Sequence, residues 1–315
     1  MPDDSDSDDD LFADSTAETT SNTAALFGVL DLLDGGAEEP QDFAAVLAGA
    51  PEAVSLGVGD GGDSGAARLA DALAQPVPSV ARLDLEGRGV GDTGFAAVAA
   101  KLSQLPRLAE LFAANNALGA SSARALADSL RGGALAGLQS LDLNANSLGD
   151  AGLEALGAAA AAGALAQLSK LYVDKNRITD AGVAAFAAAT IGGALPRLYE
   201  LWLSNNELTS AGAAALFGAL GGGALSNLGD LRLQYNRLDD GALAALQAAA
   251  GRGALSNLWY LGVAENPFSD DGLRSLAAAI RAGALPKLDF VTASTATTSA
   301  DAQREVQAAT THRPR

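Results

Sequence analysis

The chain has 315 residues, 49% of them apolar, and a formal net charge of −18, with fifteen of its 38 acidic residues in the first 60 positions, which contain no Lys or Arg. Cysteine is absent, so disulfides, thiolate catalysis and cysteine-ligated zinc are excluded. The near-neutral remainder has no basic cluster for nucleic acid, and without a signal peptide or a long apolar run we expect a cytoplasmic or nuclear protein with no membrane partner.

The first 50 residues divide into two predicted parts. Residues 1–20 are rich in Asp, Ser and Thr and hold too little apolar surface to fold, so we predict a disordered acidic tail. Residues 21–50 are predicted to be a helical cap over the end of the following domain, with a second short helix at 43–47. The apolar positions at helical spacing are Leu26, Val29, Leu30, Leu32 and Leu33.

From residue 51 to about 306 the sequence repeats with a period of thirty residues. The pattern LxxLxLxxNxL is followed by xxxGxxxLxxAL and a glycine-containing GALxxL. Its clear copies start at Leu138, Leu168, Leu198, Leu228 and Leu258. Weaker copies on both sides bring the total to about eight to nine repeats. Residues 307–315 are assigned to a C-terminal tail.

Each repeat contains two different spacings of apolar residues. The alternation in LxLxx predicts a short strand. The four-residue spacing of Gly212, Leu216 and Leu220 predicts a helix after the asparagine. The residues expected to cap such helices at their N-termini are Thr179, Thr209, Asp239 and Ser269, and glycines at the far ends allow the chain to reverse.

The repeat resembles the leucine-rich repeats of the ribonuclease-inhibitor-like subclass, which also occur in Ran GTPase-activating proteins and intracellular immune receptors. The resemblance implies an α/β leucine-rich repeat solenoid, or horseshoe, with a parallel β-sheet on the concave face and α-helices on the convex face. It leaves three functions open: a protein-binding scaffold, a GTPase activator of the Ran-specific type, and the repeat arm of a receptor. The absence of cysteine separates this chain from the ribonuclease inhibitors themselves.

One asparagine recurs at the end of each predicted strand. These residues are Asn116, Asn146, Asn176, Asn206, Asn236 and Asn266. Backbone groups point into the array there, and a carboxamide with two donors and an acceptor can bridge adjacent turns. We therefore interpret the six residues as a structural asparagine ladder and not as a ligand site.

Trp202 lies between two leucines of a predicted strand, so it should face the concave surface while the leucines enter the core. Aromatic residues and one arginine concentrate at this position, two positions before it and at the strand exit. They are Phe112, Tyr172, Trp202, Arg232, Tyr235, Tyr260 and Phe290, and we predict that they bind a protein partner. The competing interpretation is that aromatic residues simply favour strands. Tyr199 and Trp259 could face either way and are left out.

The chain offers little for catalysis. Its only histidine is His312, which excludes histidine-based triads and metal sites. The predicted concave acids Asp84, Glu86, Asp142 and Asp174 are interpreted as solvated charge and not as a catalytic carboxylate pair. We predict no catalytic residue, cofactor or metal. The expected function is a monomeric, non-enzymatic protein-interaction module, and the alternative is a GTPase activator.

Overall fold

The computed structural model describes residues 29–30, 54–57 and 61–311, in which short strands alternate with helices. The strands are β1 Val29–Leu30, β2 Val54–Gly57, β3 Val80–Asp84, β4 Glu110–Phe112, β5 Ser140–Asp142, β6 Lys170–Tyr172, β7 Glu200–Trp202, β8 Asp230–Arg232, β9 Tyr260–Gly262 and β10 Phe290–Thr292. The α-helices are α3 Gly62–Ala72, α4 Asp92–Ala99, α5 Ala120–Arg131, α6 Gly149–Ala161, α7 Asp180–Thr190, α8 Ser210–Gly221, α9 Asp240–Gly251, α10 Asp270–Arg281 and α11 Ala300–Thr311, and the 3-10 helix is η2 Leu102–Gln104.

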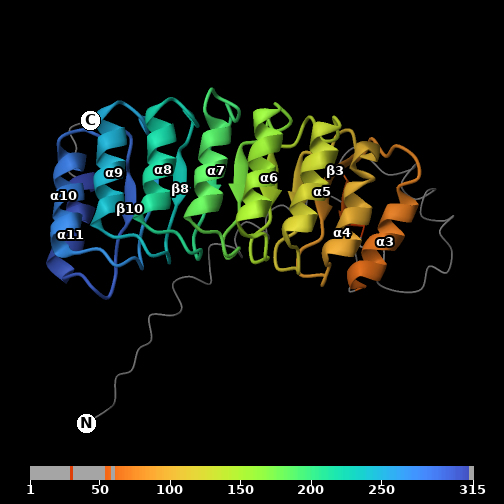
Figure 1. Ribbon diagram of the computed structural model, residues 1–315, viewed down its shortest axis with the longest axis horizontal. Coiled ribbons are helices and arrows are strands. Elements are labelled where there is room, and N and C mark those ends of the chain that lie inside the picture. Colours follow the sequence, from red (N-terminus) through yellow and green to blue (C-terminus); the bar gives the residue numbers. More distant parts are fainter. Residues whose placement is uncertain (1–28, 31–53, 58–60, 312–315) are drawn as a thin grey trace, which may run out of the picture.

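The strands form one parallel sheet in chain order from β1 to β10. The helices stand side by side in the same order along the long axis of the molecule, in a layer over one face of that sheet (Figure 1). From β4 to β10 the pairing is strictly in register, so that Leu141, Leu171 and Leu201 are direct neighbours. The α/β horseshoe expected from the repeat pattern is confirmed.

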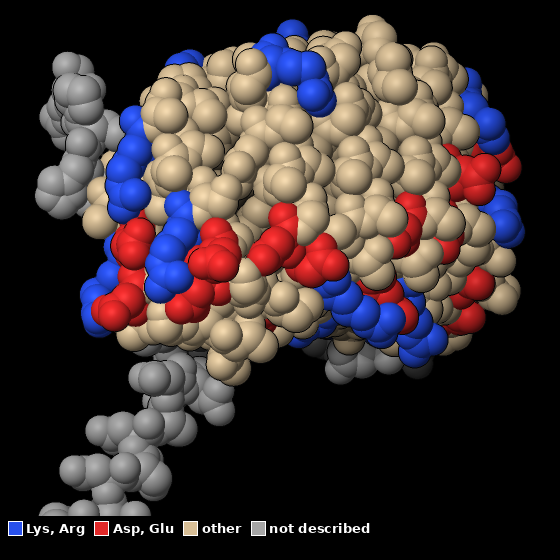
Figure 2. Space-filling model, turned by 60° about the vertical axis from the view of Figure 1, so that its left-hand side comes forward, with Lys and Arg blue, Asp and Glu red and all other residues tan. Residues whose placement is uncertain are grey.

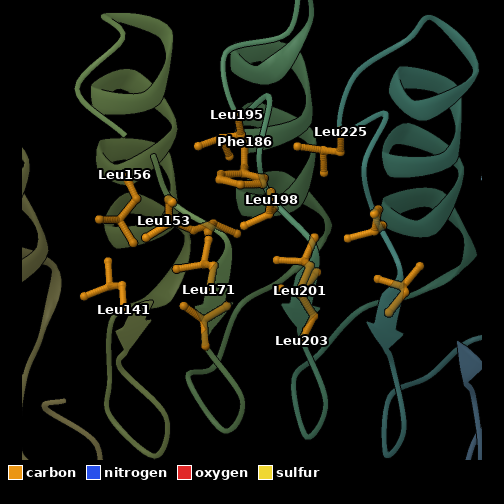
Figure 3. Packing of buried hydrophobic residues seen from close by; sticks show 14 of the residues in the cluster. Leu141, Leu153, Leu156, Leu171, Phe186, Leu195, Leu198, Leu201, Leu203 and Leu225 are labelled. Atoms are coloured by element: carbon orange, nitrogen blue, oxygen red, sulfur yellow. The ribbon is translucent and has the colours of Figure 1, made fainter. Parts of the chain in front are cut away.

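The core lies between the sheet and the helices. The central leucine of each strand from β4 to β9 meets leucines, alanines and phenylalanines from the helices and the loops that precede the strands (Figure 3). Phe186 and Leu201, for example, are each no more than 1% exposed. Alanine is frequent on the helix faces because its small side chain and high helix propensity allow neighbouring helices to pack closely.

Both ends of the array differ from the expectation. Val29 and Leu30 were expected to be helical, but they form β1 and pair with Ser55 and Leu56 of β2. A strand satisfies the backbone groups along the edge of β2, which a helix would leave unpaired. The acidic tail at 1–20 and the expected helix at 43–47 lie outside the described residues. At the other end α11 runs to Thr311, past the expected boundary at 306.

The helix ends follow the predicted signals. Thr179, Thr209, Asp239 and Ser269 each accept a hydrogen bond from a backbone N–H in the first turn, which confirms them as N-caps. Glycines after the helices adopt positive φ and reverse the chain, as at Gly223 with φ 91°. No helix in the described ranges has the length and apolar character needed to cross a bilayer.

The ladder asparagines connect neighbouring repeats. Nδ2 of Asn206 donates to the carbonyl of Val173 in the preceding repeat and to that of Leu203 in its own. Its Oδ1 accepts from the backbone N–H groups of Asn176 and Ile178. At the other five asparagines Nδ2 likewise donates to a carbonyl of the preceding repeat, and Oδ1 accepts from one backbone N–H of that repeat. The residue before each of the six asparagines has a positive φ of 51° to 56°. The hydrogen bonds offset the cost of this left-handed conformation in residues that are not glycine.

A second contact joins the first turns of successive helices. The Asp180 carboxylate accepts hydrogen bonds from the backbone N–H and the hydroxyl of Thr209, the N-cap of the next helix. A Cβ added at Gly212 would come within 3.0 Å of the Asp180 Cα and still closer to its carboxylate. The glycine of the xxxGxxx motif is therefore required by close packing against the preceding repeat. Asp150 makes the same contacts with Thr179 and Gly182.

We predict that Asn206→Ala lowers the free energy of unfolding by about 3 kcal/mol, because five backbone groups in two repeats lose this partner. Asn206→Asp should be nearly as harmful, since a carboxylate accepts but cannot donate. Urea denaturation followed by circular dichroism measures both. The control is Asn227→Ala, which removes one exposed bond to Pro196 and should change little; an equal effect at Asn227 would contradict the assignment.

We predict that Gly212→Ala destabilises the protein by about 2 kcal/mol, because the new methyl group overlaps Asp180. Helix propensity alone predicts the opposite sign. The matched control is Gly218→Ala in the same helix, where a Cβ meets nothing within 4 Å and should stabilise by up to about 1 kcal/mol. If both variants shift the urea midpoint upward, the packing explanation is wrong.

Candidate functional site

The sheet register brings the predicted partner-binding residues of the central strands together. Trp202 on β7 pairs with Tyr172 on β6 and with Arg232 on β8. Asp230, two residues before Arg232, pairs with Tyr260 on β9. Alternation along each strand sends these side chains to the concave face, because the intervening leucines are buried against the helices.

Four of the residues form a continuous row, which we call the aromatic stack: Tyr172, Trp202, Arg232 and Tyr260. The Tyr172 and Trp202 ring centroids are 4.1 Å apart, with an angle of 31° between the ring planes. The Arg232 guanidinium carbon lies 3.8 Å from the centroid of the Trp202 ring and 4.9 Å from that of Tyr260. Arg232 therefore joins two aromatic side chains by cation–π contacts.

Charged neighbours hold the aromatic stack in place. Arg232 donates a hydrogen bond to the carboxylate of Asp230 at 3.1 Å. The Asp230 residue is only 3% exposed. Burial raises the pKa of the Asp230 carboxyl, while the hydrogen bonds and charge of Arg232 oppose this shift. The Tyr172 hydroxyl donates to Glu200, which also pairs with Lys170 at 3.1 Å. Burial and this hydrogen bond raise the pKa of Tyr172, so its hydroxyl stays protonated.

The stack exposes less ring surface than the sequence suggests. Tyr172 is only 9% exposed, so a partner could touch little of it. Tyr172 and Arg232 come from the strands on either side of Trp202, so they cover opposite faces of its indole ring. The indole N–H is buried without a well-formed hydrogen bond but is close enough to Asp230 to lower the pKa of that carboxyl. A partner would meet the edge of Trp202 and not its face.

The remaining predicted residues lie around the stack. Phe290 on β10 is adjacent to Tyr260 in register and 58% exposed. Tyr235 lies in the turn after β8 and is 47% exposed. Phe112 is separate from the stack, because Asp142 on β5 occupies the intervening position, and its ring packs under Arg82 at 4.1 Å.

Tyr199 and Trp259 extend the aromatic surface, although the sequence did not settle where they face. Trp259 packs at 5.8 Å against Tyr260 and at 5.9 Å edge-to-face against Phe290, measured between ring centroids. The Tyr199 ring occupies the space that a side chain at Gly229 would need. The sequence contained a signal for this packing. Gly229 occupies the same repeat position as Tyr199 and Trp259 and lies between them, so it leaves room for the Tyr199 ring.

Asp142 and Asp174 are two acids on the concave face, and we call them the acid pair. The two acids were expected to be solvated charge, and both are half-buried. Burial raises the pKa of Asp142 to about 6 and that of Asp174 to about 7. Each carboxylate accepts a backbone hydrogen bond, from Asn144 and Ser204 respectively, and these bonds oppose the shift. Neither has an ion-pair partner within 4.0 Å in the described part of the chain.

No cluster of side chains typical of a metal site occurs in the described residues. There is no group of three or more His, Cys, Asp or Glu side chains that could hold a metal ion. A cavity of about 290 Å³ lies between β10 and α11 at the C-terminal end of the array. Its lining is Thr292, Ala293, Ser294, Ala300, Gln303, Arg304, Val306 and Gln307. These residues include no acid and no aromatic group, and Thr292 borders the aromatic stack, because its hydroxyl lies 3.4 Å from that of Tyr260.

The acidic and basic side chains are also uneven on the outer surface. Acidic residues gather in a band across the lower half of the view in Figure 2, whereas much of the helical face carries no charge. Asp240 and Asp270 lie in the first turns of α9 and α10 and accept hydrogen bonds from the backbone N–H groups of Ser269 and Ser299. Their position near helix N-termini favours negative charge.

Comparisons with known proteins agree with the repeat pattern. A family model described as Leucine Rich repeat matches residues 138–157 and 167–187. A solved structure of an internalin (inlF) from Listeria monocytogenes is 18% identical, with a TM-score of 0.44, over 76% of this chain and 53% of that chain. This chain thus spans about half the length of that structure. No curated protein matches significantly. The family match thus identifies leucine-rich repeats at residues 138–157 and 167–187, within the α/β horseshoe.

We predict that the acid pair makes stability fall as pH rises. Because both carboxyls have a raised pKa when folded, the folded state binds protons more strongly between about pH 4 and pH 7, so the free energy of unfolding decreases through that window. Asp142→Asn with Asp174→Asn should be more stable than the wild type at pH 8 by roughly 2 kcal/mol, and equal to it near pH 4. Urea denaturation across this range tests it; a difference independent of pH would contradict it.

Proposed function

We propose that this protein is a non-enzymatic interaction module that binds a protein partner through its concave face. The observation that carries the proposal is the aromatic stack, which crosses four neighbouring strands and continues into the exposed Phe290. Leucine-rich repeats in general mediate protein–protein interactions. Trp, Tyr and Arg are also the residue types enriched in the energetically important centres of such interfaces.

The arrangement suits a partner that meets a rigid surface. The stack is fixed by ring contacts and by the bond from Arg232 to Asp230, and its strands are held in register by the ladder asparagines. Side chains that are already ordered lose little entropy on binding. The exposed part of this surface consists of the edge of Trp202 with Phe290, Tyr199 and Tyr235 around it.

We also propose that the repeats belong to the ribonuclease-inhibitor-like subclass. A period of thirty residues and a full α-helix of 11 to 13 residues in the repeats from α5 to α10 support this assignment. The alternative function, GTPase activation of the Ran-specific type, rests on the family resemblance alone, because nothing in the described residues favours it.

We predict that Trp202→Ala weakens binding of a captured partner about tenfold, because it removes the middle of the stack and leaves Tyr172 and Arg232 without their shared contact. The partner is identified by affinity capture from native lysate and mass spectrometry, and its dissociation constant is then measured with both proteins purified. The control is Ile191→Ala, which removes a 60% exposed apolar side chain outside the concave face. Equal binding by the wild type and Trp202→Ala would refute the proposed site.

A further inference from the structure

The concave face has an imbalance of charge. In each repeat from β3 to β10, three alternate positions in and just after the strand face the concave side. At these positions the acids outnumber the bases by seven to three. The acids are Asp84, Glu86, Glu110, Asp142, Asp174, Glu200 and Asp230, and the bases are Arg82, Lys170 and Arg232. The surface that the proposed function assigns to a partner is therefore negative.

All three bases are already engaged. Arg82 lies 3.6 Å from Asp84 and 3.5 Å from Glu110. Lys170 pairs with Glu200 and Arg232 with Asp230, both at 3.1 Å. The excess negative charge is thus concentrated at Asp142 and Asp174, together with Glu86, whose carboxylate accepts only a neutral hydrogen bond, from Asn115.

Aromatic side chains flank the acid pair. In register, Asp142 lies between Phe112 on β4 and Tyr172 on β6. Neighbouring strands are about 5 Å apart, so a cation that reaches the Asp142 carboxylate comes within cation–π range, about 6 Å, of the adjacent part-exposed Phe112. Arg82 stacks on Phe112 from the side of β3 and so leaves the side toward β5 to another cation. Carboxylates beside an aromatic ring are suited to Lys and Arg side chains.

We propose that the concave face binds a basic segment of a protein partner, whose Lys or Arg side chain sits over Asp142 and Asp174 beside Phe112. This inference rests on the proposed function and specifies the chemistry of its partner. Two carboxylates that are partly removed from water, and that have no ion-pair partner within 4.0 Å among the described residues, are stabilised when a partner supplies one. A basic side chain also places its aliphatic stem over the neighbouring stack, which a small inorganic cation would leave uncovered.

Binding of this kind depends on pH, because only ionised carboxylates attract the cation. The groups that act on the acid pair are Asp84, Glu86, Tyr172, Lys175 and Arg232, in addition to the mutual repulsion of Asp142 and Asp174. Affinity should fall as the pH is lowered from 8 to 5.5, since both carboxyls take up protons in that window.

The experiment measures binding of fluorescein-labelled octalysine and octaarginine to the full chain by fluorescence anisotropy, at about 150 mM salt, where interactions between distant surface charges are screened. Asp142→Asn with Asp174→Asn should weaken binding at pH 8 by tenfold or more and remove most of the pH dependence. Octaglutamate and fully acetylated octalysine should not bind. The asparagine side chains can still accept from Asn144 and Ser204, so the variant should fold, which thermal denaturation followed by circular dichroism checks.

The matched control removes two acids elsewhere, through Glu154→Gln on α6 and Asp271→Asn on α10, and leaves the same net charge. It should weaken binding less than twofold. An equal loss in both double variants, or no loss in either, would overturn the inference, because binding would then reflect overall charge or another part of the chain. The captured natural partner separates the two proposals. If it is lost with Trp202→Ala but retained by the acid-pair variant, the proposed function stands and the basic-segment inference fails.

Discussion

The asparagine carboxamide between successive turns sets the spacing of the whole array. At Asn206 one buried side chain satisfies two N–H groups and three carbonyls that belong to two repeats. No backbone partner is available there, because the chain leaves the strand through a left-handed residue. Each repeat is thereby held at a fixed distance and angle from the one before it.

That fixed spacing explains both the aromatic stack and the acid pair on the concave face. Side chains at equal positions of neighbouring strands come about 5 Å apart, so Tyr172, Trp202 and Arg232 stack directly on one another. The same spacing places Asp142 diagonally beside Asp174, where the two carboxylates repel each other and are partly removed from water. A rigid aromatic row and an uncompensated pair of acids are thus two results of one repeat geometry.

Much of the fold was predictable because it depends on short-range patterns. The alternating leucines around Trp202 and the capping residue Thr209 act within a few residues of themselves, and both predictions are confirmed. The conformation of Val29 and Leu30 was not predictable in this way, because apolar spacing allowed a helix while the open edge of β2 required a strand. Helix propensity favours alanine over glycine, so it does not predict that Gly212 is required. The requirement comes from Asp180 in the preceding repeat, which leaves no room for a side chain.

The sequence by itself determined that repeats of thirty residues form strands and helices, which leucines enter the core, and which strand positions carry the aromatic residues. Only the tertiary structure decided how much of each side chain remains accessible. Exposure, the covering of both faces of Trp202 and the raised pKa values of Asp142 and Asp174 depend on groups about thirty residues away in the chain. Local sequence specifies where a side chain points, but desolvation and charge depend on everything that packs around it.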